Sequence, residues 1–382
     1  MSYKNIFSNL RKQLHSEPEL SGKEVKTAEK IHSELKKISP NKIITQLGGT
    51  GIAAIFEGKF PGKTIMFRAE LDALPIMETN KFEHASKNAG VSHKCGHDGH
   101  AVILIGLGQL LAENPPKKGK VVLLFQPAEE NGEGAKAILD DPKFSEIKPD
   151  YIFALHNIPG CEKGKILCKP GSFTASVSSV AIKLKGFTSH AAEPENGRNP
   201  DLAISELIQT IKSYAEPDQN SSNFSVVTTV FSQLGSKDYG ISAGEGEVHF
   251  TIRSWEPDIL EELKTKIETC VETISKKHKL ETSTDWFAEF EANQNDETAV
   301  QLVKQAAEEN ELEYISLSHP FKWGEDFGRF THEFKGAMFG LGAGKTIPVL
   351  HNPGYDFPDE IIPFGVNMFY SILKLVHVEF HH

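Results

Sequence analysis

Residues 119–130 read GKVVLLFQPAEE, and this stretch decides the fold class of the chain. Its apolar run, 121–125, shows no polar alternation, which is typical of a strand that is covered on both faces. Similar runs recur at 51–58 (GIAAIFEG), 63–75 (KTIMFRAELDALP) and 151–157 (YIFALHN). Helical patterns lie between the runs, at 99–116 and 132–141. We therefore expect an α/β domain built on a largely buried sheet.

A different order of elements begins near residue 175. The patterns run strand, helix, strand, strand, helix, strand, in the segments 176–186, 199–215, 223–235, 245–255, 258–278 and 279–290. This βαββαβ order is the signature of a ferredoxin-like fold. A helical pattern at 296–309 and a buried strand pattern at 336–344 then return to the alternation of helices and buried strands that precedes residue 175. We predict a discontinuous first domain, 1–174 and 291–382, with an inserted ferredoxin-like α+β domain at 175–290.

The composition excludes several classes of partner and location. The chain has 382 residues, 39% of them hydrophobic, and a formal net charge of -11. Neither nucleic acid nor an anionic membrane surface is therefore an expected partner. The longest apolar run, 101–111, is shorter than the roughly 20 residues that cross a bilayer. The N-terminal stretch has helically spaced apolar residues and no signal-peptide core, so we expect a cytoplasmic protein with reduced cysteines.

A dense cluster of metal-ligand residue types lies at 92–101, SHKCGHDGHA. A thiol, imidazoles and a carboxylate in one short stretch point to a metal, either structural or catalytic. More such residues follow the expected strands at their carboxyl ends, where open α/β sheets bind ligands. They are Glu70, Asp72, Glu129, Glu130 and His156, and the late loop 350–360 adds His351. A doubled carboxylate suits a divided role, in which one group binds metal and the other moves a proton.

The chain resembles the M20 metallopeptidase family, and within it the amidohydrolase branch of N-acyl-amino-acid, hippurate and auxin-conjugate hydrolases. The resemblance spans nearly the full length and rests on ordered motifs. These are LRKQLHSEPELSGKE (10–24), FRAELDALP (67–75), HKCGHDGHA (93–101), LLFQPAEENGEGA (123–135), ALHN (154–157), GFTSHAAEPENGRNP (186–200), GEDFG (324–328) and LHNPGYDFPDE (350–360). The resemblance implies a mixed-sheet metallohydrolase catalytic domain that carries the inserted domain.

The resemblance also implies a site. Two divalent metal ions would be held by Cys95, His97, Glu130, His156 and His351. Cys95 would bridge the ions, at a position where other branches of the family use an aspartate. Glu129 would be the general base, and His190 of the inserted domain would reach the scissile carbonyl, often across a dimer interface. Zinc and manganese suit these ligands, and cobalt or nickel also fit.

The implied activity is hydrolysis of the amide bond of a small N-acyl amino acid, such as an N-acetyl or N-benzoyl amino acid. A homodimer formed through the inserted domain is the expected assembly. Three alternatives stay open: a dipeptidase or other metallo-exopeptidase of the same fold, a long-chain acyl substrate, and a catalytically inactive metal-binding protein. A structural zinc site would use ligands close together in sequence, whereas these extend from residue 95 to residue 351.

Other candidates receive supporting or less certain roles. Residues expected to orient ligands or pack around them are Glu70, Asp72, His93, Asp98 and His100, whereas His15 and Glu19 are expected to support the fold. Arg253 is a candidate for binding a substrate carboxylate, with a salt bridge inside the inserted domain as the alternative. Segment 238–253 lacks the Asn-Val-Ile-Pro-Asp run that many members of the branch carry. This departure concerns the substrate pocket and leaves the expected reaction unchanged.

Overall fold

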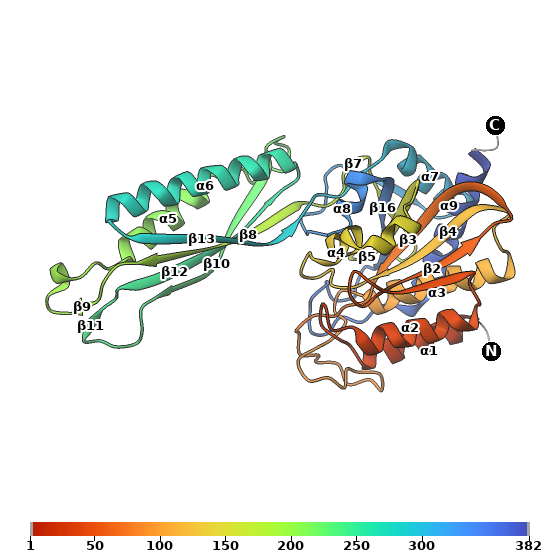
Figure 1. The fold of residues 1–382 in the computed structure, drawn as a ribbon, viewed down its shortest axis with the longest axis horizontal. Coiled ribbons are helices and arrows are strands. Elements are labelled where there is room, and N and C mark those ends of the chain that lie inside the picture. Colours follow the sequence, from red (N-terminus) through yellow and green to blue (C-terminus); the bar gives the residue numbers. More distant parts are fainter. Residues whose placement is uncertain (1–2, 380–382) are drawn as a thin grey trace. The chain divides into compact units, whose positions relative to one another are not determined.

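The computed structural model describes residues 3–379 and divides into two compact units (Figure 1). Unit 1 comprises Met1–Phe173, Asn293–Ser318 and Glu325–His382, and unit 2 comprises Thr174–Ala292 and His319–Gly324. His381 and His382, to which the sequence assigns no role, lie outside the described residues. In the described part of the chain, no helix is long and apolar enough to span a bilayer.

Unit 1 is built on a mixed sheet, which confirms the predicted fold class. The strand order is β1-β2-β4-β3-β5-β16-β6-β15. In that order the strands span Lys42–Leu47, Gly51–Glu57, Lys118–Gln126, Phe60–Glu70, Tyr151–Pro159, Lys335–Gly344, Ile166–Cys168 and Tyr314–Ser316. The central neighbours β4, β3, β5 and β16 are parallel, and the β1-β2, β2-β4 and β16-β6 pairs are antiparallel. The unbroken apolar runs form this central part because both of its faces are covered.

One face of the sheet forms the main hydrophobic core with the long helices of unit 1. These helices are α1 (Tyr3–Ser16), α2 (Val25–Lys37), α3 (His97–Glu113), α7 (Glu297–Glu309) and α9 (Ile362–Glu379). Alternate strand side chains, such as Phe67, Phe125 and Phe153, belong to this core. Because side chains alternate across a strand, Arg68 and Gln126 face the other side of the sheet. The short helices α4 (Gly134–Asp140) and α8 (Gly328–Glu333) pack together and contact β4 and β16, respectively.

Unit 2 has the predicted βαββαβ order. Its elements are β8 (Ser176–Lys185), α5 (Asp201–Ser213), β10 (Ser225–Leu234), β12 (Glu245–Ser254), α6 (Pro257–His278) and β13 (Glu281–Phe290). The sheet order is β10-β12-β8-β13, with antiparallel neighbours. Val180, Ile182 and Phe250 share a separate hydrophobic core with α5 and α6. A further two-stranded pair joins β9 (Ser189–His190) to β11 (Ile241–Ser242).

One segment lies in a different unit from the one expected. Residues 319–324 belong to unit 2, whereas the sequence-based prediction places them in the first domain. The backbone N–H of Ala175 donates to the carbonyl oxygen of Trp323 over 3.1 Å. The ring of His319 stacks on Trp255, with centroids 5.4 Å apart. These contacts are made with residues distant in sequence, so no local pattern reveals them.

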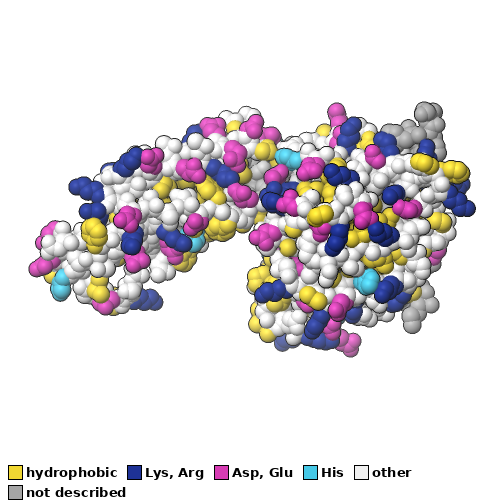
Figure 2. Space-filling model, viewed as in Figure 1, with side chains coloured by type: hydrophobic (Ala, Val, Ile, Leu, Met, Phe, Trp, Pro, Cys, Tyr) yellow, Lys and Arg dark blue, Asp and Glu magenta, His cyan; other side chains and the backbone are white. Residues whose placement is uncertain are grey.

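The remaining elements are short. Strands β7 (Gly171–Ser172) and β14 (Gln294–Asn295) pair close to the points where the chain leaves and re-enters unit 1. Single turns of 3-10 helix span Pro142–Glu146, Pro194–Asn196 and Asp359–Ile361. Figure 2 shows acidic and basic side chains interspersed over the face that it draws, with no basic patch on that face.

Candidate functional site

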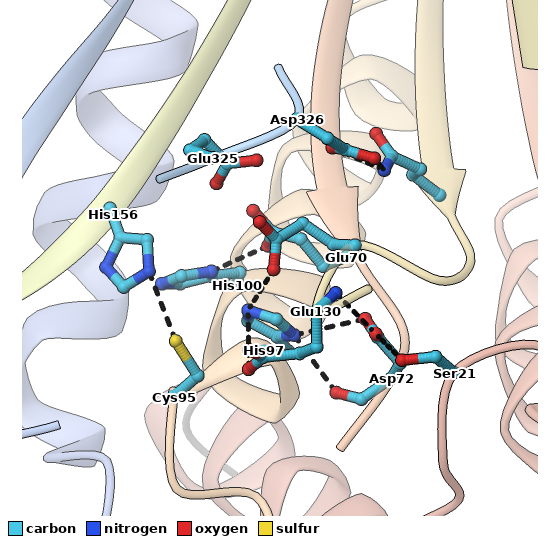
Figure 3. Close-up of polar contacts among 12 residues, drawn as sticks. Ser21, Glu70, Asp72, Cys95, His97, His100, Glu130, His156, Glu325 and Asp326 are labelled. Atoms are coloured by element: carbon cyan, nitrogen blue, oxygen red, sulfur yellow. Dashed lines mark hydrogen bonds and ion pairs between the residues drawn. The ribbon is translucent and has the colours of Figure 1, made fainter. Parts of the chain in front are cut away.

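Four of the five predicted metal ligands lie close together near the carboxyl ends of β3, β4 and β5 in unit 1, namely Cys95, His97, Glu130 and His156 (Figure 3). Two groups of candidate ligand atoms, each with its members within 4.8 Å of one another, share Cys95. One group is Cys95, His97 and His156, and the other is Cys95, Glu130 and His351. The Cys95 sulfur lies 3.4 Å from Nε2 of His156. Cys95 therefore has the position of a ligand that two neighbouring ions could share.

Unusual backbone conformations help these side chains to converge. Gly96 adopts a φ of 100° and turns the chain from Cys95 into α3, which begins at His97. A Cβ atom at Gly96 would overlap the side-chain oxygen of Asn157, so the position suits only glycine. His351 itself has a φ of 63°, in the left-handed region that residues with a side chain rarely adopt. Such outliers cluster at functional sites, where the surrounding structure stabilises them.

Hydrogen bonds orient the two buried imidazoles in the same way. Nδ1 of His97 lies 3.0 Å from the backbone oxygen of Asp72, and Nδ1 of His156 lies 2.9 Å from the backbone oxygen of Asn157. A carbonyl oxygen can only accept, so Nδ1 carries the proton in both rings. The other ring nitrogen, Nε2, then faces the cluster and is the atom that can bind a metal ion once it carries no proton. Metal-binding histidines are commonly oriented by an outer acceptor of this kind.

The donor set fits a divalent metal ion. Nε2 of His97 lies 3.8 Å from Glu129 and 3.9 Å from Glu130. Among the described residues, neither this nitrogen nor Oε1 of Glu130 has a hydrogen-bond partner, although both atoms are buried. Buried polar atoms without partners are costly. A cation among these nitrogen, oxygen and sulfur ligands would satisfy them, and this ligand mixture is typical of zinc and related metals.

The electrostatics of the cluster also favour a bound cation. Burial, together with the carboxylates of Glu130, Glu129 and Glu70, raises the pKa of the Cys95 thiol well above its usual value. A metal-binding thiolate would therefore need positive charge beside it. Burial alone would lower the pKa of His97, but Glu70, Asp72 and Glu130 raise it to about 10. In the absence of metal, the acidic surroundings retain a proton at the place where a cation would bind.

Glu129 has the environment of a proton-transfer group. Its side chain is buried, and its oxygen lies within 4.8 Å of oxygens of Glu325 and Asp326. Burial and the neighbouring charges of Glu325, Glu130 and Asp326 raise the pKa of Glu129 well above its ordinary value. A raised pKa makes a carboxyl group easier to protonate than it is in water, and proton-transfer carboxyl groups commonly have this property.

A buried ionic cluster beside Glu129 has no counterpart in the sequence-based prediction. The Arg68 guanidinium donates to Glu325 and to Asp326, each over 2.8 Å. Nε2 of Gln126 lies 2.8 Å from both carboxylate oxygens of Asp326. The motif GEDFG that contains Glu325 and Asp326 is visible in the sequence, but its role is not. The detectable signal is Arg68 itself, an arginine inside an otherwise apolar buried strand.

The residues expected to orient the ligands surround the cluster. His100 binds Glu70 through Nδ1 over 2.7 Å and contacts the side-chain oxygen of Asn157 through Nε2 over 2.6 Å. Both nitrogens of His100 are thus engaged, and its ring also forms a candidate ligand group with Glu70 and His97. His93 is 2% exposed, and its ring nitrogens have no hydrogen-bond partner among the described residues. Asp72 accepts the backbone N–H of Glu130 over 2.9 Å, so it also fixes the chain at Glu130.

A second buried ionic network lies next to the stretch that carries Cys95 and His97. His15 binds Asp98 over 2.8 Å and Glu78 over 3.1 Å. Lys94 pairs with Glu78 and also donates to the backbone oxygen of Tyr355 over 2.7 Å. His15 thus supports the fold, as expected, and it does so through Asp98, the residue after His97.

The other two predicted site residues, His190 and Arg253, belong to unit 2. His190 is exposed on β9, and its Nδ1 accepts the backbone N–H of Ala192 over 3.1 Å. Its partner in β11 is Ile241, which lies in the segment that departs from the branch pattern. Arg253 donates to the backbone oxygen of Lys322 over 3.0 Å. No carboxylate in the described chain lies within ion-pair distance of Arg253, which disfavours the alternative of an internal salt bridge, and burial lowers its pKa.

Comparison with known proteins identifies the family. The model of peptidase family M20/M25/M40 matches residues 66–375. The chain is 31% identical over 364 residues to N-acetyldiaminopimelate deacetylase of Oceanobacillus iheyensis, covering 95% of this chain and 97% of the relative. It is 34% identical over 356 residues to N-acetyl-L-cysteine deacetylase of Bacillus subtilis, covering 92% and 84%. The crystal structure of the Bacillus subtilis YXEP protein, described as a dinuclear metal-binding peptidase, matches with a TM-score of 0.83 and 27% identity over 98% of each chain. The chain therefore belongs to peptidase family M20/M25/M40 and is a hydrolase of this family.

Proposed function

We propose that the protein is a metal-dependent amidohydrolase that converts a small N-acyl amino acid into a carboxylate and a free amino acid. The observation that carries this proposal is the pair of ligand groups that share Cys95, with Glu129 beside them. A purely structural metal site would have no use for a buried proton-transfer carboxylate next to its ligands. The relatives described as deacetylases of N-acetyldiaminopimelate and N-acetyl-L-cysteine support an N-acyl amino acid as substrate.

We assign the metal-binding role to Cys95, His97, Glu130, His156 and His351. Thiolate and imidazole ligands favour zinc, cobalt or nickel, and the carboxylate also accepts manganese, so we propose zinc or manganese as the native metal. When bound, two such ions supply Lewis-acid polarisation of the amide carbonyl and lower the pKa of water. The chain itself supplies the proton path and the contacts that hold the substrate.

Glu129 accepts a proton from the attacking water as the new carbon–oxygen bond forms. The same carboxyl group then donates that proton to the leaving nitrogen as the carbon–nitrogen bond breaks. We assign to His190 the donation of a hydrogen bond to the oxyanion of the tetrahedral intermediate. Arg253, whose guanidinium has only a backbone acceptor among the described residues, would bind the substrate carboxylate through paired hydrogen bonds.

We also propose a homodimer formed through unit 2. Strand β10 lies at one edge of the sheet of unit 2 and carries exposed apolar side chains. Their exposed fractions are 55% for Val230, 42% for Phe231 and 43% for Leu234. Exposed apolar edge strands are sites of strand pairing between chains. Light scattering of the native chain and of Leu234→Lys tests the proposal, since the variant should be monomeric and equally folded. A native chain that is monomeric at all concentrations contradicts it. The cytoplasmic location stays a prediction of the sequence.

A substrate panel with a variant of Glu129 tests the proposed reaction. The panel contains N-acetyl, N-benzoyl and long-chain N-acyl amino acids and dipeptides, assayed with metal-stripped protein and with protein reloaded with zinc or manganese. Glu129→Gln should retain metal and lose about a hundredfold or more in kcat. Glu133→Gln, an exposed position in the same loop, is the matched control and should match the wild type.

The outcomes separate the open alternatives. A strong preference for dipeptides would favour the exopeptidase alternative, and activity confined to long acyl chains would favour the long-chain alternative. Bound metal without hydrolysis of any compound would favour an inactive metal-binding protein. If Glu129→Gln turns over every active substrate at the wild-type rate, the proposed mechanism is wrong.

A further inference from the structure

Glu24, far from the metal ligands in sequence, binds the backbone of the turn that presents Glu129. Its carboxylate is fully buried. Oε1 accepts the backbone N–H of Gly22 over 2.7 Å and that of Ala128 over 2.8 Å, and Oε2 accepts the hydroxyl of Thr50 over 2.7 Å. Ala128 is the residue immediately before Glu129. Glu24 thus crosses from the start of α2 to the turn that follows β4.

This turn has a backbone conformation that needs external support. Ala128 has a φ of 52°, in the left-handed region that is unfavourable for a residue with a Cβ atom. Its N–H is held by Glu24, and its carbonyl oxygen accepts the N–H of Gly134 over 2.9 Å. Two residues later, the N–H of Glu130 is held by Asp72. Glu24 therefore anchors Ala128, the residue before Glu129, whereas Asp72 anchors Glu130.

The choice of a carboxylate at position 24 is energetically unusual. Within the described chain, Glu24 has no lysine, arginine or histidine at ion-pair distance. Burying a charge without a cationic partner is costly unless hydrogen bonds compensate. The compensating hydrogen bonds all come from loop residues, and one of them comes from Ala128 in the turn that precedes Glu129.

We infer that Glu24 is a positioning residue for Glu129: through the N–H of Ala128 it fixes the left-handed turn, and with it the direction of the Glu129 carboxylate. The inference rests on the proposed function, because it concerns the residue assigned there as the proton carrier. The metal ligand Glu130 is anchored by a different carboxylate, that of Asp72, whose Oδ2 also accepts the hydroxyl of Ser21 over 2.7 Å. A defect at Glu24 should therefore change proton transfer more than metal binding.

Variants of Glu24 show whether the length of its side chain or its negative charge matters for the turn. Glu24→Asp keeps the charge but is one methylene too short to hold Gly22, Thr50 and Ala128 together. Its kcat should fall about tenfold to hundredfold, since a misplacement of about 1 Å costs up to that much, with KM and metal content unchanged. Glu24→Gln keeps an oxygen at the same distance, and its NH2 group can donate to the Thr50 hydroxyl, so it should stay near wild type. The matched control is Glu19→Asp, because Glu19 binds Thr27 through its N–H and hydroxyl and does not touch the turn.

Amide hydrogen exchange gives a readout that does not depend on activity. In metal-free protein, the Ala128 amide should lose protection in Glu24→Asp and keep it in Glu24→Gln. Should Glu24→Asp fail to fold, Thr50→Val provides the second variant, because it frees Oε2 and leaves Glu24 in place. Thr50→Val should then show a smaller fall in kcat with unchanged KM.

The outcomes also separate this inference from the proposed function. Wild-type kcat in Glu24→Asp, or in Thr50→Val if the former does not fold, overturns the inference. So does an equal loss in Glu24→Gln, which would make charge the decisive property, or an equal loss in Glu19→Asp, which would indicate general support of the segment. If Glu129→Gln is inactive while Glu24→Asp is normal, only the inference fails. If Glu129→Gln is fully active, the proposed function fails.

Discussion

The backbone N–H of His351 donates to the carbonyl oxygen of Lys94 over 2.8 Å, so one candidate ligand is joined directly to the residue that precedes another, Cys95. The Lys94 side chain strengthens this connection, because it is fully buried and donates to the backbone oxygen of Tyr355. Its ammonium group also pairs with Glu78. A single lysine therefore links the two loops through both its backbone and its side chain.

Replacing Lys94 by methionine should weaken both stability and metal binding. The substitution leaves the buried Glu78 carboxylate without its lysine partner, and breaking a buried ion pair costs about 3 kcal/mol or more. Loosened loops should also lower metal affinity about tenfold to hundredfold. Urea denaturation and titration with cobalt, followed through its visible absorption, measure the two effects. Lys87→Met is the control, since its ion pair with Glu17 is exposed. Unchanged cobalt affinity in Lys94→Met would show that the link does not shape the site.

Cys95 should determine how many ions the chain holds. Cys95→Ala removes the ligand common to both groups, so it should bind fewer ions than the wild type and lose activity. Cys95→Asp should recover the metal stoichiometry, because a carboxylate can also bridge two ions. Metal analysis after dialysis measures the bound ions for each variant. Equal metal content in Cys95→Ala and wild type would contradict a bridging role.

Gly96 should be far more sensitive to substitution than Gly90. Both glycines have positive φ, 100° and 78°, so alanine at either position costs about 1–2 kcal/mol through the backbone alone. At Gly90 the new methyl group meets no atom within 4 Å, whereas at Gly96 it overlaps Asn157. Gly96→Ala should therefore lose clearly more unfolding free energy than Gly90→Ala, and bind metal more weakly as well. Equal losses in the two variants would mean that the loop shifts freely around Gly96.

His15 should make the stability of the protein depend on pH in the alkaline range. Burial lowers its pKa, but hydrogen bonds to Asp98 and Glu78 outweigh burial and raise the pKa from 6.5 to about 9. A raised pKa in the folded state means that the stabilisation is fully present below pH 6.5 and is lost as the pH rises through 9. The loss should reach at most about 3 kcal/mol. Denaturation of metal-loaded protein between these pH values should show this decline in the wild type and a flatter profile in His15→Gln. Parallel profiles would assign the pH dependence to other groups.

Much of the fold could be predicted because its signals are local. The βαββαβ order and the return to the first unit follow from hydrophobic periodicity, which each segment shows by itself. The buried strands were recognisable for the same reason. Residues 319–324 form no helix or strand and join unit 2 through tertiary contacts alone. Periodicity could not place them.

The site could be predicted in part. The strand-end position and chemistry of His156 and the Glu129–Glu130 pair mark them as candidates, and the structure places His156 and Glu130 beside Cys95 and Glu129 beside His97. The supporting residues were much harder to recognise. Arg68 binds Glu325 across a separation of 257 residues, and the link from Glu24 to Ala128 spans 104 residues. Neither pair forms a spacing that sequence reasoning can detect.

The sequence by itself determined the class of fold, the family resemblance, and which residue types gather at the strand ends. It did so because apolar periodicity and the order of motifs are properties of the chain before folding. Only the tertiary structure decided that Arg68 and Glu325 lie beside Glu129 and that Glu24 holds the turn before Glu129. Those relationships depend on distances between segments, which the register of the sheet and the packing of the loops set only when the chain is folded.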